Sequence, residues 1–226
     1  MEKYGAIIIG AGHAGCEAAL SCARLGVKTL IITINANSIA GMSCNPAVGG
    51  IAKGQMVREM DAMGAQMGLN TDATGIQFKM LNSSRGAAVW SPRAQCDKEM
   101  YSLSMSQTLQ RQENLDILQS EVSQIIIKNN KACGVQIATG EKIEARVVIV
   151  TTGTFLLGRI YLGKNSFSGG RFNERASLYL SKSLTEDCGL KLSRFKTTTP
   201  PRINSNSIDY SKMKEQPGDE KPYPFS

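Results

Sequence analysis

Short apolar runs separated by small and polar residues mark the first 33 residues of the chain. The run from Ala6 to Ile9 contains no polar position, which is typical of a strand buried in a parallel sheet. Small, helix-compatible residues follow from Cys16 to Ala23, and a second apolar run extends from Thr29 to Thr33. We therefore predict a strand, a turn, a helix and a second strand, in this order.

Glycines at positions 10, 12 and 15 lie between the first predicted strand and the helix. In a GxGxxG turn the first glycine permits the tight turn, the second lets the backbone approach a pyrophosphate, and the third lets the helix pack closely. The phosphate then meets the N–H groups of the helix N-terminus. The predicted cofactor-binding segment consists of Gly10, Ala11, Gly12, His13, Ala14 and Gly15. The alternatives are a turn that binds nothing and, for His13, a general base instead of a residue that shapes the turn.

The second predicted strand ends without the acidic residue that usually binds the ribose of a dinucleotide. Thr33 occupies that place, and no acidic residue occurs between Glu17 and Glu59. This departure disfavours a plain NAD dehydrogenase. It leaves the hydroxyl of Thr33 or the amide of Asn35 to meet the ribose.

A long excursion, residues 36–112, follows the second strand. It opens with a glycine-rich loop, residues 41–54, which adds little apolar surface to a core and carries one thiol, Cys44. Apolar side chains then recur at helical spacing and predict a helix whose methionines pack in the core: Met56, Val57, Met60, Met63 and Met67. A second helix is predicted over residues 93–111, after Ser91 and Pro92.

Apolar runs alternate with turn residues from position 115 to position 150. The runs 115–119, 122–127, 133–138 and 143–150 are broken by Asn129-Asn130 and Thr139-Gly140, which are typical of short antiparallel turns. We predict a β-meander that returns to a buried strand, residues 147–150. Gly153 follows in a turn of small residues that permits close approach of a ligand. A helix is predicted over residues 177–188, and an extended, proline-rich segment ends the sequence.

Composition narrows the classes of protein that fit this pattern. With 226 residues and 42% apolar content, the chain can form one large or two small domains. No apolar run approaches the roughly 20 residues that span a bilayer, and the N-terminus lacks a signal peptide, so we expect a cytoplasmic protein without membrane association. The net charge of +7 suits an anionic partner such as a nucleotide or a nucleic acid.

Six scattered cysteines without a CxxC pair, together with a single histidine, argue against a zinc site or a redox pair. We therefore expect no metal site. Most of these thiols are expected to be reduced and buried. Only Cys44 lies in a loop whose composition indicates exposure.

Four segments of the sequence are, in order, GAGHAGCEAA, GMSCNPAVGGIAKG, PRAQCDKEMY and TTTPPRI. Together they resemble the glucose-inhibited division protein A family of tRNA uridine 5-carboxymethylaminomethyl modification enzymes (MnmG), and the resemblance covers essentially the whole chain. It implies an α/β fold, namely a Rossmann-like FAD-binding domain of the two-dinucleotide-binding-domain flavoprotein type with a β-meander and a helical insertion. Residues 1–200 would form the N-terminal part of this domain, incomplete without a C-terminal return segment. Residues 201–226 would cross over into an NAD-binding or insertion domain that is missing.

The resemblance also implies a chemistry. Enzymes of this family bind FAD, use NADH to reduce it and take a one-carbon unit from methylenetetrahydrofolate. With a GTPase partner, MnmE, they add a carboxymethylaminomethyl or aminomethyl group to C5 of the wobble uridine of certain tRNAs, and they act as homodimers. For the 226 residues alone we expect weak FAD binding and no activity.

Individual residues carry over from the family by position. Gly10 through Gly15 match its FAD-binding segment, Val122 its adenine contact and Ser177 a further flavin contact. Cys44 is implied as the catalytic thiol, and Lys53 and Arg58 are the nearby cations that could favour its thiolate; the alternative is a packing thiol in a flavin-binding loop. In such a flavin-binding loop the backbone at Asn45, Gly49 and Gly50 would approach the flavin.

Two other functions fit parts of the sequence. A different FAD-dependent oxidoreductase, such as a succinate dehydrogenase-like flavoprotein, would share the glycine turn but should carry an acidic residue at position 33 and a histidine for flavin attachment. An inactive nucleotide- or RNA-binding module would fit the net charge of +7 and would tolerate loss of the Cys44 thiol.

Overall fold

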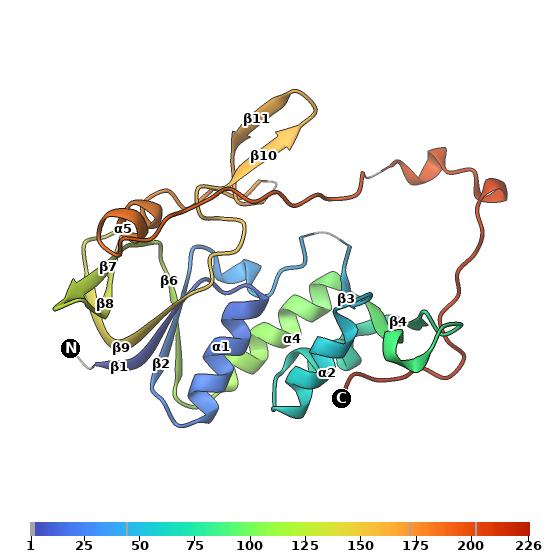
Figure 1. Cartoon of the computed structure of the whole chain (residues 1–226), viewed down its shortest axis with the longest axis horizontal. Helices are drawn as coiled ribbons and strands as arrows, with labels where there is room; N and C mark the ends of the chain where they lie inside the picture. The colour runs from blue at the N-terminus through green and yellow to red at the C-terminus, as the bar shows by residue number, and fades with distance from the viewer. Residues whose placement is uncertain (1–2, 44, 172, 202) are drawn as a thin grey trace. The chain divides into compact units, whose positions relative to one another are not determined.

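The computed structural model describes residues 3–43, 45–171, 173–201 and 203–226 (Figure 1). The chain forms two compact units. The sheet unit consists of Met1–Gly41 and Ser102–Ser193, and the insertion unit consists of Met42–Tyr101 and Arg194–Ser226. The sheet unit contains the glycine turn, and the insertion unit contains the glycine-rich loop after Gly41.

A six-stranded sheet with the order β6-β2-β1-β9-β8-β7 forms the sheet unit. Its parallel part consists of β6 (Leu115–Gln119), β2 (Thr29–Thr33), β1 (Tyr4–Ile9) and β9 (Lys142–Val150). The other end of β9 continues into an antiparallel meander with β8 (Lys131–Ile137) and β7 (Val122–Lys128). This arrangement confirms the predicted Rossmann-like α/β fold with a meander.

Strand β1 lies in the middle of the parallel part and has a partner on each side. Ile8 lies opposite Ile31 of β2 and Ile149 of β9. Ile7 and Ile8 point to opposite faces and both are completely buried, so both faces of the sheet are covered here. Helix α1 (His13–Arg24) connects β1 to β2 and buries one face, formed by Gly15, Cys16, Ala19, Leu20 and Ala23.

The predicted turn of the meander lies between β7 and β8. Asn129 and Asn130 have φ angles of 51° and 58°, the left-handed values that a two-residue hairpin turn requires and that asparagine tolerates. Helix α5 (Leu180–Glu186) packs against this part, where the Ser183 hydroxyl accepts a hydrogen bond from the N–H of Ile125 at 2.9 Å. Leu180 and Leu184 thereby join the core of the meander.

Shorter elements complete the sheet unit. The turn η1 (Ala36–Ser38) follows β2, and the strands β10 (Arg159–Leu162) and β11 (Asn165–Ser168) form a hairpin that sequence analysis did not predict (Figure 1). Helix α4 (Lys98–Arg111) enters this unit at Ser102 and buries Met105 and Leu109 in it.

The insertion unit contains both helices and a sheet. Strands β3 (Ala47–Gly49), β5 (Ser91–Cys96) and β4 (Gly75–Leu81) form an antiparallel sheet in the order β3-β5-β4, accompanied by α2 (Gly54–Ala62), α3 (Met67–Thr74) and the short turn η2 (Ala87–Val89). The end of the sequence, with η3 (Ser205–Ser207) and η4 (Tyr210–Lys212), has no strand or longer helix among its described residues. Its last part binds this unit, because the N–H groups of Phe225 and Ser226 both donate to the Asp72 carboxylate.

Two predictions about strands were wrong. Residues 93–96 belong to β5 instead of a helix, because the proline-containing segment pairs with β4 on one side and β3 on the other. Residues 115–119 form β6, which pairs in parallel with β2 and is not part of the meander. A half-apolar pattern such as LDILQ predicts a strand but does not identify its neighbour.

Two predictions about burial were also wrong. The methionine stripe is not one buried helix face, because α2 ends at Ala62 and Met63 is 81% exposed. Within α2 only Gly54 and Val57 are buried. The last part of β9 is also more open than predicted, since Val147 is 51% exposed.

Candidate functional site

The carboxyl ends of the parallel strands meet at one edge of the sheet unit. Segments 10–15, 34–38, 120–121 and 151–153 follow β1, β2, β6 and β9, respectively. Thr33 is the last residue of β2, and Val122 is the first residue of β7, directly after segment 120–121. In open α/β sheets, ligands bind in the crevice outside this edge. All sequence-predicted cofactor residues of the sheet unit, apart from Ser177, therefore belong to segments at this edge.

The glycine turn has the geometry that its motif requires. Gly10 has a φ of +101°, and a Cβ atom there would lie 2.6 Å from the carbonyl oxygen of Thr151. A Cβ atom at Gly15 would overlap the carbonyl oxygen of Gly10, so the helix approaches the turn as closely as glycine allows. At Gly12, by contrast, nothing lies within 4 Å of an added Cβ. The turn is closed on the protein side and open above Gly12.

Helix α1 begins directly at this opening, with Gly12 as its N-cap. The cap has no side-chain hydrogen bond, and the first turn of the helix holds no acidic residue. Ala11 is buried and its carbonyl oxygen accepts the N–H of Ala40 at 2.8 Å, while Ala14 is exposed. The first N–H groups and the positive end of the helix dipole therefore remain available to an anion.

Thr151 fastens the end of β9 to the glycine turn. Its hydroxyl lies 2.9 Å from the carbonyl oxygen of Ile9 and 3.0 Å from that of Gly10, and its N–H donates to Ile9 as well. Sequence analysis treated this residue only as part of a small-residue turn, and its position directly after a predicted buried strand is the signal that was available. Two residues on, Gly153 has no atom within 4 Å of an added Cβ, which leaves room for a ligand.

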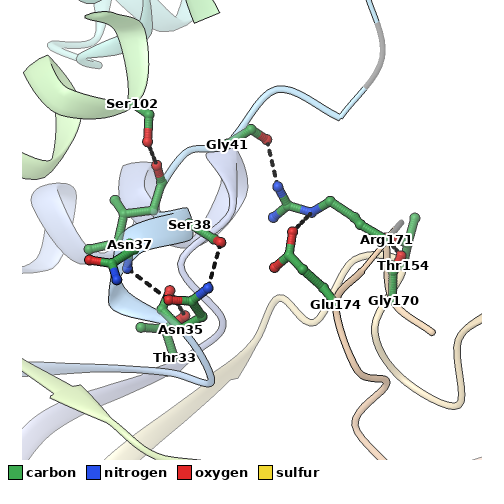
Figure 2. A network of polar contacts seen from close by, with 11 residues as sticks. Thr33, Asn35, Asn37, Ser38, Gly41, Ser102, Thr154, Gly170, Arg171 and Glu174 are labelled. Carbon is green, nitrogen blue, oxygen red and sulfur yellow. Dashed lines mark hydrogen bonds and ion pairs between the residues drawn. The ribbon is translucent and has the colours of Figure 1, made fainter. Parts of the chain in front are cut away.

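Thr33 and Asn35 differ in how firmly their side chains are engaged (Figure 2). The Asn35 amide closes the η1 turn, because Oδ1 accepts the N–H of Asn37 at 3.0 Å and Nδ2 donates to the Ser38 hydroxyl at 2.9 Å. Toward the residues that the structure describes, the Thr33 hydroxyl makes only a long hydrogen bond, 3.4 Å, to the carbonyl oxygen of Asn35. Of the two side chains, Thr33 is the freer to meet a ribose.

Val122 and Ser177 come together through a residue that sequence analysis missed. Both are almost completely buried. Glu121, directly before Val122, accepts the N–H of Leu178 at 3.1 Å and pairs with Arg175 at 3.5 Å. Glu121 is also the only charged side chain among the described residues that belongs to the buried class. An isolated glutamate in a sequence gives no sign of such a role.

Asn45, Gly49 and Gly50 lie in the insertion unit. Gly49 has a packing reason within that unit, since a Cβ atom there would overlap the carbonyl oxygen of Pro92 and lie 2.8 Å from the Phe225 ring. Gly50 has a φ of +95° and donates its N–H to Pro92. The carbonyl oxygen of Asn45 accepts the N–H of Ala47. The predicted catalytic Cys44 lies outside the described residues, so its role and the approach of these residues to a flavin stay predictions.

Burial and a neighbouring cation set the protonation of the groups in the sheet unit. The pKa of His13 is lowered, first by burial and then by the positive charge of Arg171. Burial raises the pKa of the Cys16 thiol to about 12. In the insertion unit, burial raises the pKa of Cys96 to about 11. These two thiols are therefore protonated at neutral pH and unsuited to nucleophilic chemistry.

The described residues contain no group of three or more metal-ligating side chains that could hold a metal ion. Within the same ranges, no helix combines the length and the apolar character needed to cross a bilayer.

Comparisons with known proteins agree with this geometry. The family model described as "Glucose inhibited division protein A" matches residues 5–226. The tRNA uridine 5-carboxymethylaminomethyl modification enzyme MnmG of Endomicrobium trichonymphae is 71% identical over 225 residues, which cover 100% of this chain and 38% of that protein. The chain thus spans little more than a third of the length of this curated relative.

Solved structures of related proteins also match this chain. The structure of Aquifex aeolicus GidA in its form II crystal superposes with a TM-score of 0.95 at 50% identity, covering 99% of this chain and 37% of that one. A GidA-related protein from Thermus thermophilus shares the fold at a TM-score of 0.56 and 18% identity, covering 81% of this chain and 68% of that one.

Proposed function

We propose that this chain, which belongs to the glucose inhibited division protein A family, supplies the FAD-binding part of a tRNA-modifying enzyme. The single observation that carries the proposal is the open glycine turn before α1, at the carboxyl edge of a parallel sheet. The names of the relatives, which are tRNA uridine modification enzymes, support the substrate class.

The residues at this edge fit FAD. The open space above Gly12 and the uncapped start of α1 suit the pyrophosphate. Thr33 offers its hydroxyl to the ribose, and we assign Val122 and Ser177 to the adenine and flavin contacts implied by the family resemblance. Gly153 leaves room beside β9 for the part of the cofactor that extends from the pyrophosphate. When bound, FAD supplies the redox chemistry, while these residues hold and orient it.

Cys44 is the proposed catalytic thiol. A nucleophilic cysteine needs a lowered pKa, in contrast to the raised values of the buried Cys16 and Cys96. Of the two cations considered for this role, Arg58 donates to the carbonyl oxygen of Pro224 at 2.8 Å and stacks on Tyr223, whereas Lys53 is exposed. We therefore propose Lys53, rather than Arg58, as the cation that favours the thiolate.

The activity of the whole protein is part of the proposal. The enzyme would use NADH and methylenetetrahydrofolate, act with the GTPase MnmE as a homodimer in the cytoplasm, and add an aminomethyl or carboxymethylaminomethyl group at C5 of the wobble uridine. Because the chain spans 38% of the Endomicrobium relative, we expect these 226 residues to bind FAD weakly and to lack activity.

Absorbance between roughly 350 and 500 nm, in the range of the flavin bands, tests the proposal. The full-length product of the gene and residues 1–226 are each mixed with FAD and then with NADH. A flavin band in the full-length protein that NADH bleaches supports the function. Cys44→Ser should then bind FAD normally but fail to modify tRNA.

Two results would contradict parts of this proposal. If the full-length protein binds no flavin but binds tRNA, the RNA-binding alternative replaces it. If Cys44→Ser modifies tRNA at the normal rate, the thiol is a packing residue. Tight, stoichiometric FAD in residues 1–226 would contradict only the expectation of weak binding.

A further inference from the structure

Arg171 lies between β11 and α5, and three groups hold its guanidinium. Figure 2 shows two of them, Gly41 and Glu174. Nη1 donates to the carbonyl oxygen of Gly41 at 3.2 Å, and Nε lies 3.7 Å from a Glu174 carboxylate oxygen. The group also lies 5.1 Å from the centroid of the Phe155 ring, as in a cation–π contact. Its side chain is only 19% exposed. A cation is thus fixed in one place and largely removed from water.

The positive charge of Arg171 is only partly compensated. Strong guanidinium–carboxylate pairs are bidentate at about 2.7–2.9 Å, whereas Glu174 approaches through Nε alone and at a longer distance. Nη2 makes no hydrogen bond to the described residues. Arg171 lies next to the glycine turn, because it binds Gly41, and the neighbouring Ala40 donates its N–H to the Ala11 carbonyl oxygen of that turn at 2.8 Å. Its positive charge is also the second cause, after burial, of the lowered pKa of His13 at the start of α1.

The segments that position Arg171 are themselves tied down. The N–H of Gly41 donates to Ser38 at 3.1 Å, and the Ser102 hydroxyl of α4 donates to the carbonyl oxygen of Ile39. On the other side, the Thr154 hydroxyl donates to the carbonyl oxygen of Gly170 at 2.8 Å (Figure 2). The guanidinium is therefore pre-organised and loses little freedom when it binds an anion.

We propose that Arg171 is a phosphate-binding residue of the cofactor site and meets the pyrophosphate of FAD together with the N-terminus of α1. This inference rests on the proposed function. A helix N-terminus offers the equivalent of about half a positive charge, which leaves a pyrophosphate undercompensated. The planar fork of a guanidinium supplies both the missing charge and donors that match phosphate oxygens.

The FAD affinity of the full-length protein tests this role. It is measured by quenching of flavin fluorescence at low and high salt. Arg171→Gln should weaken binding about 10- to 100-fold and reduce its salt dependence, because a charge-assisted hydrogen bond is lost. Arg171→Lys should recover part of the affinity, since it keeps the charge without the fork. The matched control is Arg159→Gln, which removes an exposed arginine whose side chain, among the described residues, bonds only to Ser166. It should change the affinity less than about twofold.

A titration with inorganic pyrophosphate tests the phosphate site independently of FAD. Pyrophosphate added to the flavin-free chain should shift the ring signals of His13 in an NMR spectrum, and Arg171→Gln should abolish the shift. The signals are assigned by their loss in His13→Gln.

The possible outcomes distinguish the role of Arg171 from the proposed function. If the wild type binds FAD and Arg171→Gln binds it equally well, the role of Arg171 is refuted while the proposed function stands. If pyrophosphate binds through Arg171 but FAD does not bind, the proposed function fails and the phosphate site remains. If neither ligand binds the wild type, both are refuted.

Discussion

Gly12 and Gly15 differ in what a methyl group would meet, although they lie in the same turn. A Cβ atom at Gly15 overlaps the Gly10 carbonyl oxygen, whereas one at Gly12 meets nothing within 4 Å. We expect Gly15→Ala to lower the free energy of unfolding by about 2 kcal/mol or more, because backbone must move. Gly12→Ala should cost less than about 1 kcal/mol but should weaken FAD binding, since the methyl group fills the open space.

Urea unfolding and FAD titration of both variants check this pair. Equal stability of the two variants would contradict the packing argument at Gly15. Full FAD affinity in Gly12→Ala would contradict a pyrophosphate at the open position.

Spacing in the sequence was sufficient to predict the roles of Gly10, Gly12 and Gly15, because these roles depend on local backbone geometry. The roles of Thr151 and Glu121 depend on partners far along the chain, so no local pattern predicted them.

His13 gives a pH dependence with a definite sign. Its pKa in the folded protein lies below the ordinary value of 6.5, so the unfolded chain binds more protons just below that pH. Stability should therefore fall as the pH falls through the window below 6.5. Between about pH 7.5 and about pH 5.5 this single group contributes at most about 1.4 kcal/mol.

Comparison with His13→Gln isolates that contribution. The variant should lose less unfolding free energy on acidification than the wild type, as measured by urea unfolding at both pH values. Parallel losses in the two proteins would show that the folded state does not disfavour the protonated imidazole.

At the scale of elements, Glu121 connects the start of β7 to the segment before α5. Its buried carboxylate accepts the partly buried N–H of Leu178, and a fully buried donor without an acceptor costs about 1–3 kcal/mol. Glu121→Ala should therefore lower the free energy of unfolding by about 1 kcal/mol, the lower end of that range, and weaken FAD binding through Ser177. Glu121→Gln keeps an acceptor oxygen and should be the milder change.

Thermal unfolding and FAD titration of the two variants test this connection. An alanine variant as stable as the glutamine variant would mean that water or another group satisfies the Leu178 N–H.

The elements themselves show where sequence patterns are sufficient to predict structure. The Asn129-Asn130 turn was predicted because both residues tolerate left-handed backbone. The parallel pairing of β6 with β2 could not be predicted from the run LDILQ, because the two strands are far apart in the sequence and the run does not specify its partner strand.

At the scale of the whole molecule, the chain crosses between its two units at residues 41–42, 101–102 and 193–194. The sequence predicted the sheet unit better than the insertion unit, because periodic apolar runs identify buried strands. The short strands β3 and β5 carry glycine and proline instead, and they form through pairing with each other and with β4. The proline-rich last segment was predicted as a crossover, whereas its contacts with Asp72 arise between residues that lie 153 and 154 positions apart.

Those contacts lead to a prediction for limited proteolysis. Lys191, Arg194 and Lys196 lie in an exposed stretch without regular structure, where trypsin should cleave first. The released C-terminal peptide should stay bound to the insertion unit, because Asp72 accepts the N–H groups of Phe225 and Ser226 and the Phe225 ring is buried.

Size-exclusion chromatography of the cleaved protein measures whether the peptide co-elutes. Asp72→Ala should release it. The matched control Asp209→Ala removes an exposed carboxylate that, within the described part of the chain, bonds only to Ser211 and Lys212, and it should leave the peptide bound. Cleavage within β4 or β5 before this stretch would contradict the assignment of residues 194–226 as the exposed part of the insertion unit. Retention of the peptide in Asp72→Ala would instead assign its binding to the burial of Phe225, which a further change, Phe225→Ala, should then abolish.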